Sequence, residues 1–175
     1  MKTHTVCILI GVALVGCASS GSARPAYTGP AANLDSGIAL YNQAKYAEAE
    51  QVFRSLQGND ARAYLAAALA RQTKYAEAQP HAEAVLEANA GHSVAVAALG
   101  NCLVGLQKYD DAIARLGAVI DANGNIAYAY FWRGQAYQHV KQTERMSADF
   151  EAFLRLAPNA PEAASVKQVL SSLRR

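Results

Sequence analysis

Apolar residues recur three and four positions apart through most of the chain, a spacing that is typical of amphipathic helices. Leu99 and Leu103 lie four positions apart in one such stretch, and Ala112, Leu116 and Val119 continue the spacing in the next. Each stretch therefore has one apolar stripe that must be buried against a neighbour. The pattern predicts an all-α protein built from helices that pack side by side.

One short stretch occurs three times and divides the helical region into units. Residues 108–112 read Lys-Tyr-Asp-Asp-Ala, and residues 45–49 and 74–78 both read Lys-Tyr-Ala-Glu-Ala. The last two copies start 34 residues apart, and the first two start 29 residues apart. A repeat of this length is typical of two-helix modules, each of which buries its apolar face against the next.

Composition and charge narrow the classes of function. The chain is 52% apolar, and much of this is alanine, which favours helix and lets helices approach closely. Its formal net charge is +2, and no cluster of lysine and arginine stands out, so nothing indicates a nucleic-acid surface. Cys102 lies in a helix-period apolar run, which favours a small buried residue over the alternative, a reactive thiol.

The first sixteen residues have the layout of a secretory signal. Lys2 precedes a short apolar run, residues 6–15, which is too short to span a bilayer as a helix. The run ends in Leu-Val-Gly-Cys at residues 14–17, which resembles the lipobox of bacterial lipoproteins. The resemblance implies that a signal peptide, residues 1–16, is removed and that Cys17 receives the lipid. An ordinary secretory signal with a chance cysteine is the alternative.

The residues after Cys17 are expected to link a lipid to the helical region. Residues 17–32 are rich in Ser, Gly, Ala and Pro and have no apolar period, which predicts a flexible tether. Ala18 and Ser19 follow the cysteine, and neither is the aspartate that marks inner-membrane retention in the lipoproteins that this segment resembles. The expected location is therefore the bacterial cell envelope, on the periplasmic side of the outer membrane.

Beyond the tether, the units resemble the tetratricopeptide repeat (TPR), a family of 34-residue helix-turn-helix modules. The family pattern has a small residue in the first helix, a tyrosine at the turn, and an alanine and then a large apolar residue in the second helix. The resemblance implies a right-handed α-solenoid of about four repeats, at about 33–58, 59–91, 92–124 and 125–158. The repeat-packing residues that it implies are Gly37, Tyr46, Ala49, Phe53, Ala66, Tyr75, Ala78, Gly100, Tyr109, Ala112, Gly134, Phe150 and Pro158.

Where the units depart from the family pattern, we expect changes in the length, start or crossing of their helices. The first unit lacks five residues, which should shorten its second helix by about a turn. Pro80 should make the second helix of unit two start late or bend. Thr143 and Met146 stand where tyrosine and alanine are usual, so the helices of unit four should cross more loosely. Gly100 and Ala112 should face each other where the helices of unit three cross.

Residues 159–175 are expected to cap the end of the array. Pro161 suits the first position of a helix, and the apolar residues that follow it share one stripe. A partner-binding or exchanged helix is the alternative. The stripe consists of Ala163, Val166, Leu170 and Leu173.

The resemblance also implies a concave groove lined by the first helix of each repeat. Helical spacing from the small residue of each unit brings aromatic, amide and guanidinium side chains onto this face, which suits an extended peptide or a partner helix. A solvated inner face, with the true interface elsewhere, is the alternative. The candidate groove residues are Tyr41, Asn42, Arg71, Asn101, Tyr128, Phe131, Gln135, Gln138 and His139.

No catalytic or metal-binding pattern stands out. The sequence has no His-x-x-x-His or Cys-x-x-Cys pair, and Ser93 beside His92 lacks an identifiable orienting carboxylate. We therefore expect no enzyme activity, no metal and no cofactor. The expected function is that of a membrane-anchored scaffold or adaptor that binds another envelope protein, as in pilus, secretion or outer-membrane assembly. A structural homo-oligomer and an accessory protein that binds or hydrolyses the cell wall are the alternatives.

Overall fold

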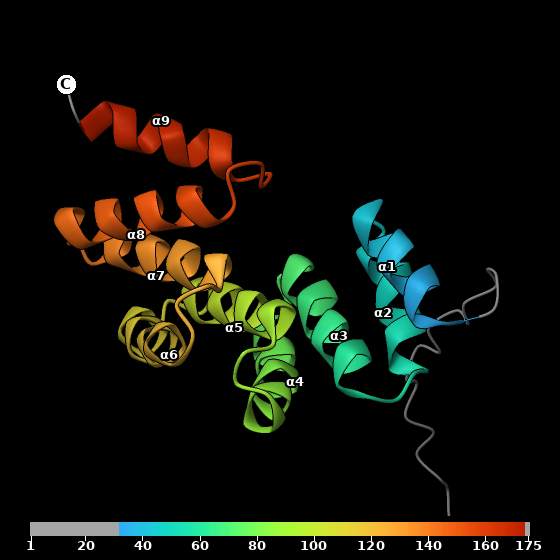
Figure 1. Ribbon diagram of the computed structural model, residues 1–175. Helices are drawn as coiled ribbons and strands as arrows, with labels where there is room; N and C mark the ends of the chain where they lie inside the picture. The colour runs from blue at the N-terminus through green and yellow to red at the C-terminus, as the bar shows by residue number, and fades with distance from the viewer. Residues whose placement is uncertain (1–31, 174–175) are drawn as a thin grey trace, which may run out of the picture.

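The repeated Lys-Tyr stretch marks the turn of a helical hairpin. In the computed structural model, which describes residues 32–173, Tyr46, Tyr75 and Tyr109 are each the first residue of a helix (Figure 1). All regular structure within these residues is α-helical, which confirms the predicted fold class. The helices are α1 (Leu34–Asn42), α2 (Tyr46–Arg54), α3 (Asn59–Arg71), α4 (Tyr75–Ala88), α5 (Ser93–Gly105), α6 (Tyr109–Ala122), α7 (Ala127–His139), α8 (Thr143–Leu156) and α9 (Ala163–Leu173).

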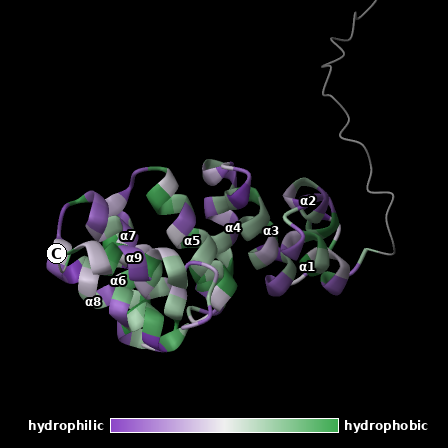
Figure 2. Cartoon of the chain, turned by 90° about the horizontal axis from the view of Figure 1, so that it is seen from above, coloured by the Kyte–Doolittle hydropathy of each residue, from purple (hydrophilic) through white to green (hydrophobic). Residues whose placement is uncertain are grey.

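The contacts between helices explain why the array curves. Each helix packs against its hairpin partner, and α3, α5 and α7 also pack against one another in that order. Within the described residues, the backbones of the second helices α2, α4, α6 and α8 do not approach one another closely, and side-chain ion pairs such as Arg115–Glu83 link neighbouring second helices. The first helices therefore form the inner layer and the second helices splay on the outside, which gives the arc in Figure 1. Hydrophobic and hydrophilic residues are intermixed along the helices (Figure 2), as is typical of helices that bury one face.

The same backbone turn closes all four hairpins. Ala44, Thr73, Gln107 and Lys141, each two residues before the second helix, have φ between 59° and 61°. The following amide then reaches back to a carbonyl of the first helix, as from Lys74 N to Leu69 O at 3.0 Å. None of the four residues is glycine, so no residue type in the sequence signals this left-handed turn.

Glycines in the first helices make room for large side chains. A Cβ on Gly37 would lie 2.4 Å from the ring of Phe53, and one on Gly134 would lie 2.7 Å from the ring of Phe150. These contacts support the assigned packing roles. Gly100 differs from the expectation, because a Cβ added there would lie 2.5 Å from Cβ and Cγ of Trp132 and does not meet Ala112 first. The close approach in unit three therefore joins two repeats and not the two helices of one repeat.

The turn tyrosines connect successive hairpins. Each tyrosine ring packs on a residue at the end of the first helix of the next hairpin, four positions before the second helix of that hairpin begins. The type of this residue differs from one unit to the next. Tyr75 lies against Gly105, where an added Cβ would be 2.5 Å from the ring. Tyr109 stacks on His139 at 4.5 Å between ring centroids, and the Arg71 guanidinium lies 6.0 Å from the Tyr46 ring centroid. The assignment of these tyrosines to repeat packing agrees with these contacts.

The helix boundaries show which of the expected departures from the repeat pattern occur. α2 has 9 residues where α4, α6 and α8 have 14, so the second helix of unit one is shortened as expected. The expected late start at Pro80 is wrong: α4 begins at its turn tyrosine and continues through the proline. Pro80 leaves only the Ala76 carbonyl without its helical donor, and Ala76 is exposed to solvent. Thr143 begins α8, and Met146 is buried, so unit four keeps the hairpin of the others.

The last helix covers the end of the array with a shorter stripe than expected. α9 begins at Ala163, so Pro161 lies in the preceding turn and not at the first helical position. Val166 and Leu170 are buried against the fourth hairpin, and Ala163 is also buried. Leu173 is 45% exposed, so the buried stripe is shorter than expected. Pro158 lies in the turn between α8 and α9, where the family pattern implied a proline.

Cys102 has the buried setting that the sequence predicts. Cys102 is fully buried, and burial raises the pKa of its thiol to about 12, which agrees with a packing role.

The proposed signal peptide, Cys17 and the tether up to residue 31 lie outside the described residues. No described helix is both long and apolar enough to cross a membrane.

A buried carboxylate links the first two hairpins. The Glu50 side chain on α2 is 3% exposed and accepts hydrogen bonds from Arg54 Nε at 2.9 Å, Gln72 Nε2 at 2.9 Å and Lys74 Nζ at 2.7 Å. Burial alone would raise the pKa of this carboxyl, but the bonds from Lys74, Gln72 and Arg54 outweigh it and lower the pKa to about 2. Gln72 and Lys74 come from the turn between α3 and α4, so the ionised carboxylate holds two repeats together.

Acid should therefore weaken the array through Glu50. Its folded-state pKa of about 2 lies below the ordinary value of 4.5, so the stabilisation is complete above pH 4.5 and is lost as the pH falls toward 2. We expect Glu50→Gln to lower the free energy of unfolding by about 2 kcal/mol at pH 7, since Arg54 and Lys74 are partly solvated, and to have little effect near pH 2. Urea unfolding at both pH values measures this. Glu48→Gln, an exposed neighbour on α2, is the control, and an equal loss at both pH values would contradict the linkage.

Candidate functional site

The inner layer of first helices encloses a groove. Side chains three, four and seven positions apart share one face of a helix, and such sets from α3, α5 and α7 meet here. The end of α1, the start of α2 and the connection between α8 and α9 close its sides, and the groove encloses about 440 Å³. It is lined by Tyr41, Asn42, Tyr46, Tyr64, Ala67, Arg71, Ser93, Val94, Ala97, Ala98, Asn101, Tyr128, Trp132, Pro161 and Glu162.

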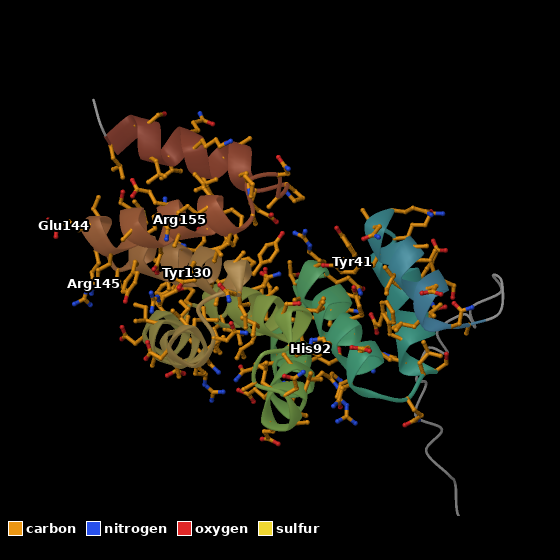
Figure 3. The ribbon with its side chains drawn as sticks, viewed as in Figure 1. Tyr41, His92, Tyr130, Glu144, Arg145 and Arg155 are labelled. Carbon is orange, nitrogen blue, oxygen red and sulfur yellow. The ribbon has the colours of Figure 1, made fainter. Side chains whose placement is uncertain are left out.

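Small residues at the bottom and aromatic residues on the walls shape this groove. Ala67 on α3 and Ala97 and Ala98 on α5 leave space that larger side chains would fill. Tyr41 packs edge-on against Tyr64, at 6.1 Å between ring centroids, and faces α3 from the inner side of α1 (Figure 3). Aromatic walls bind apolar surface at low entropic cost, and their polar ends offer hydrogen bonds.

Arg71 is the cation of the groove and is held by two tyrosines. Its guanidinium lies 6.0 Å from the Tyr46 ring centroid and interacts with the Tyr41 hydroxyl. Burial would lower the pKa of Arg71, but the interaction with Tyr41 outweighs it, so the pKa is raised. Burial raises the pKa of Tyr41, and Arg71 only partly opposes this. At neutral pH the site therefore presents a charged guanidinium beside a neutral phenol.

Glu162 is the anion of the groove and is held by a third tyrosine. The Tyr128 hydroxyl donates a hydrogen bond to Glu162 Oε2 at 2.9 Å. Burial and this carboxylate together raise the pKa of Tyr128 to about 12, so the phenol keeps its proton. Beside Tyr128, the Trp132 indole packs on Gly100, and its buried Nε1 has no hydrogen-bond partner among the described residues.

Five of the nine candidate groove residues line this one groove. Tyr41 and Asn42 come from α1, Arg71 from α3, Asn101 from α5 and Tyr128 from α7. They are far apart in the sequence, and the stacking of the first helices brings them together. Their common placement agrees with the predicted concave face, while their role in binding stays a prediction.

Phe131 does not lie in the groove, contrary to expectation. It is 6% exposed and packs against Phe153, at 5.1 Å between ring centroids, in the core of the fourth hairpin. On α7 the groove face is occupied by Tyr128 and Trp132, which are four positions apart. Phe131 is turned away from this face toward α8, which explains its burial.

Gln135, Gln138 and His139 also lie outside the groove. They occupy the last two turns of α7, whereas the groove meets this helix only in its first two turns, at Tyr128 and Trp132. The groove crosses the array obliquely, from the last residues of α1 to the first turns of α7. The expectation failed because it assumed that every repeat contributes at the same height along its first helix.

Other groove residues were missed in the sequence for different reasons. Tyr64 lies seven positions before Arg71, so helical spacing on α3 could have identified it. Tyr46 was assigned only to packing, but it both packs on Arg71 and lines the groove. Glu162 follows the last repeat, and no repeat pattern predicts that this connection reaches the concave side.

The described residues show no arrangement typical of a metal site. Within residues 32–173 no three His, Cys, Asp or Glu side chains cluster closely enough to hold a metal ion. His92 caps the start of α5 by accepting from the Ala95 amide, and its Nε2 lies 2.9 Å from Asp60 Oδ1. This histidine thus joins α3 and α5 in a structural contact, and Ser93 beside it lines the groove.

A comparison with protein families supports the resemblance read from the sequence. Residues 69–136 match the tetratricopeptide repeat family model, and this range covers the end of α3, the helices α4, α5 and α6, and most of α7. No curated protein matches the sequence at a significant level. The family match thus rests on the part of the chain with the most regular repeats.

Solved structures share the fold over most of this chain. TTC0263, a thermophilic TPR protein of Thermus thermophilus, is 20% identical with a TM-score of 0.70, covering 80% of this chain and 78% of its own. YrrB, a TPR protein with an unusual peptide-binding site, is 20% identical with a TM-score of 0.59, covering 75% and 71%. MamA from Desulfovibrio magneticus RS-1 is 20% identical with a TM-score of 0.56, covering 81% and 92%. At these identities the likeness is one of fold.

Proposed function

We propose that this tetratricopeptide-type solenoid is a lipid-anchored scaffold of the bacterial cell envelope, whose concave groove binds a segment of another envelope protein. The observation that carries the proposal is the groove itself, where aromatic, amide and charged side chains from four first helices converge. Solenoids of stacked helical repeats commonly bind proteins on such concave surfaces. YrrB, which shares the fold, has a peptide-binding site, and this supports the same use of the fold here.

The chemistry of the groove suits binding more than catalysis. The raised pKa values of Tyr41 and Tyr128 keep these two phenols protonated at neutral pH, and hydrogen bonds and ring contacts fix the charged groups. Asn42 and Asn101 add amide groups that can both donate to and accept from a peptide backbone. The mechanism we propose is therefore non-covalent capture of an extended segment or a partner helix.

Filling the groove should abolish partner binding without unfolding the protein. Ala97 lies in the groove on α5, whereas Ala114 is exposed on α6 outside it. We expect Ala97→Trp to reduce recovery of the partner in a pull-down at least about tenfold, and Ala114→Trp to have no effect. Circular dichroism checks that both variants keep their helices. Equal recovery with both variants would remove the groove from the proposal.

The lipid anchor has its own test. The Leu-Val-Gly-Cys sequence at residues 14–17 motivates the proposal that Cys17 is acylated. We expect Cys17→Ala to abolish incorporation of radiolabelled palmitate and to move the protein from the membrane fraction to the soluble fraction. Cys102→Ala is the control and should change neither. Labelled protein that persists in the Cys17→Ala variant would contradict lipidation at this residue.

A further inference from the structure

Two opposite charges face the same groove without neutralising each other. Arg71 is placed by Tyr41 and Tyr46, and Glu162 is placed by the hydrogen bond from Tyr128. The two charges are close enough to interact electrostatically. Yet within the described residues neither belongs to an ion pair at 4.0 Å or less. Each charge is thus held in position and remains available to a ligand.

This arrangement differs from two other places within residues 32–173, where charges on different helices pair directly. Glu83 on α4 receives Arg115 from α6 at 2.6 Å, and Asp149 on α8 receives Arg133 from α7 at 2.8 Å. Both of those pairs lie between helices and serve packing. Arg71 and Glu162 instead come from α3 and from the connection before α9, and both line the groove.

Ligands of one charge sign fit this groove poorly. A purely acidic segment that approaches Arg71 is repelled by Glu162, and a purely basic segment that approaches Glu162 is repelled by Arg71. A neutral apolar segment would cover both charges and remove water from them without replacing its hydrogen bonds. A segment that carries one acidic and one basic side chain on the same face satisfies both charges at once.

We propose that the groove selects a polypeptide segment bearing an acidic side chain for Arg71 and a basic side chain for Glu162. This inference rests on the proposed function, since it names the chemistry of the partner that the groove binds. The aromatic walls contact the apolar part of the segment, and the two charges fix its position along the groove. Charge reversal at either position should then change which peptides bind, and not merely how tightly they bind.

The test is selection of random 12-residue peptides, displayed on phage, by the purified full-length protein in detergent micelles. The natural protein should enrich peptides that contain both an acidic and a basic residue at a fixed spacing. Arg71→Glu should select peptides with two basic residues, and Glu162→Lys should select peptides with two acidic residues. Each reversal should weaken binding of the originally selected peptides by about tenfold. Lys141→Glu, a reversal at an exposed hairpin turn outside the groove, is the matched control and should leave the selection unchanged.

The outcomes separate this inference from the proposed function. Peptides whose charge composition follows the two reversals support the inference. Peptides that bind the natural protein and not Ala97→Trp, but show no charge preference or an unchanged preference in the reversed variants, overturn it and leave the groove as a binding site. Failure of the natural protein to select any peptide that Ala97→Trp does not also select overturns the inference and the proposed peptide groove together.

Discussion

Replacement of Asp149 by alanine should lower the free energy of unfolding by about 3–5 kcal/mol, because it leaves a partly buried guanidinium without its counter-ion. Asp149 on α8 is 4% exposed and accepts two hydrogen bonds from Arg133 on α7, from Nε and from the second terminal nitrogen, both at 2.8 Å. The hydrogen bonds that Arg133 donates to this carboxylate raise the pKa of the arginine. A guanidinium also stays charged without such a partner, so the substitution leaves an unpaired charge. Arg133 also lies 5.8 Å from the ring centroids of Tyr130 and Tyr137, which limits its escape to solvent.

Urea unfolding followed by circular dichroism measures this effect. Asp121→Ala, at an exposed position of α6, is the control and should change the stability by less than about 0.5 kcal/mol. Replacing both Asp149 and Arg133 by apolar residues of similar size should recover part of the lost stability, because no unpaired charge then remains. A loss for Asp149→Ala that is no larger than the control's would show that the pair does not stabilise the last hairpin.

Because Gly134 contacts Phe150, Gly134→Ala should destabilise the natural protein but stabilise the Phe150→Ala variant. Phe150→Ala should cost about 3–5 kcal/mol, because the ring is fully buried and leaves a cavity. In the natural chain, Gly134→Ala should cost about 1–3 kcal/mol, since the added Cβ would lie 2.7 Å from a ring that is enclosed on all sides. In the Phe150→Ala background the same substitution should stabilise the protein by up to about 1 kcal/mol, because alanine is the better helix former and nothing opposes its methyl group.

A double-mutant cycle on these two residues tests the size match directly. Unit two provides the precedent, since Ala66 and Ala82 occupy the corresponding positions and both are fully buried. The double variant should therefore resemble the alanine pairing of unit two. Additive effects of the two substitutions would contradict the size match and would indicate that α7 and α8 adjust their spacing independently of these side chains.

The sequence predicted the hairpins well because their signals are local and periodic. Tyr46, Tyr75 and Tyr109 mark the turns, and the small residue in each first helix marks a close approach, although Gly100 makes its approach to the next repeat. The left-handed turn residues carry no such signal, because alanine, threonine, glutamine and lysine occupy the position where glycine would have revealed it. Pro80 was a misleading signal, since its effect depends on the exposure of Ala76, which the sequence alone does not state.

Only five of the nine candidate residues line the groove, because its path depends on tertiary geometry. Arg71 and Asn101 follow from helical spacing, but the oblique crossing excludes Gln135, which occupies the same place in its repeat as Asn101. Glu162 enters the groove through a connection outside the repeats, and the pairing of Arg133 with Asp149 joins two helices whose relative rotation no single-helix pattern fixes. These features depend on how the repeats stack, and repeat-by-repeat patterns do not contain that information.

The most direct test of the central claim is photo-crosslinking in living cells from two positions, Asn101 in the groove and Ala114 outside it. A photoreactive amino acid at each position, followed by mass spectrometry of the adducts, identifies what lies against each surface. If the groove binds a partner, position 101 should yield a discrete adduct with another envelope protein that is absent from position 114. Adducts from position 114 and none from position 101 would contradict the account and would place the interface on the outer layer.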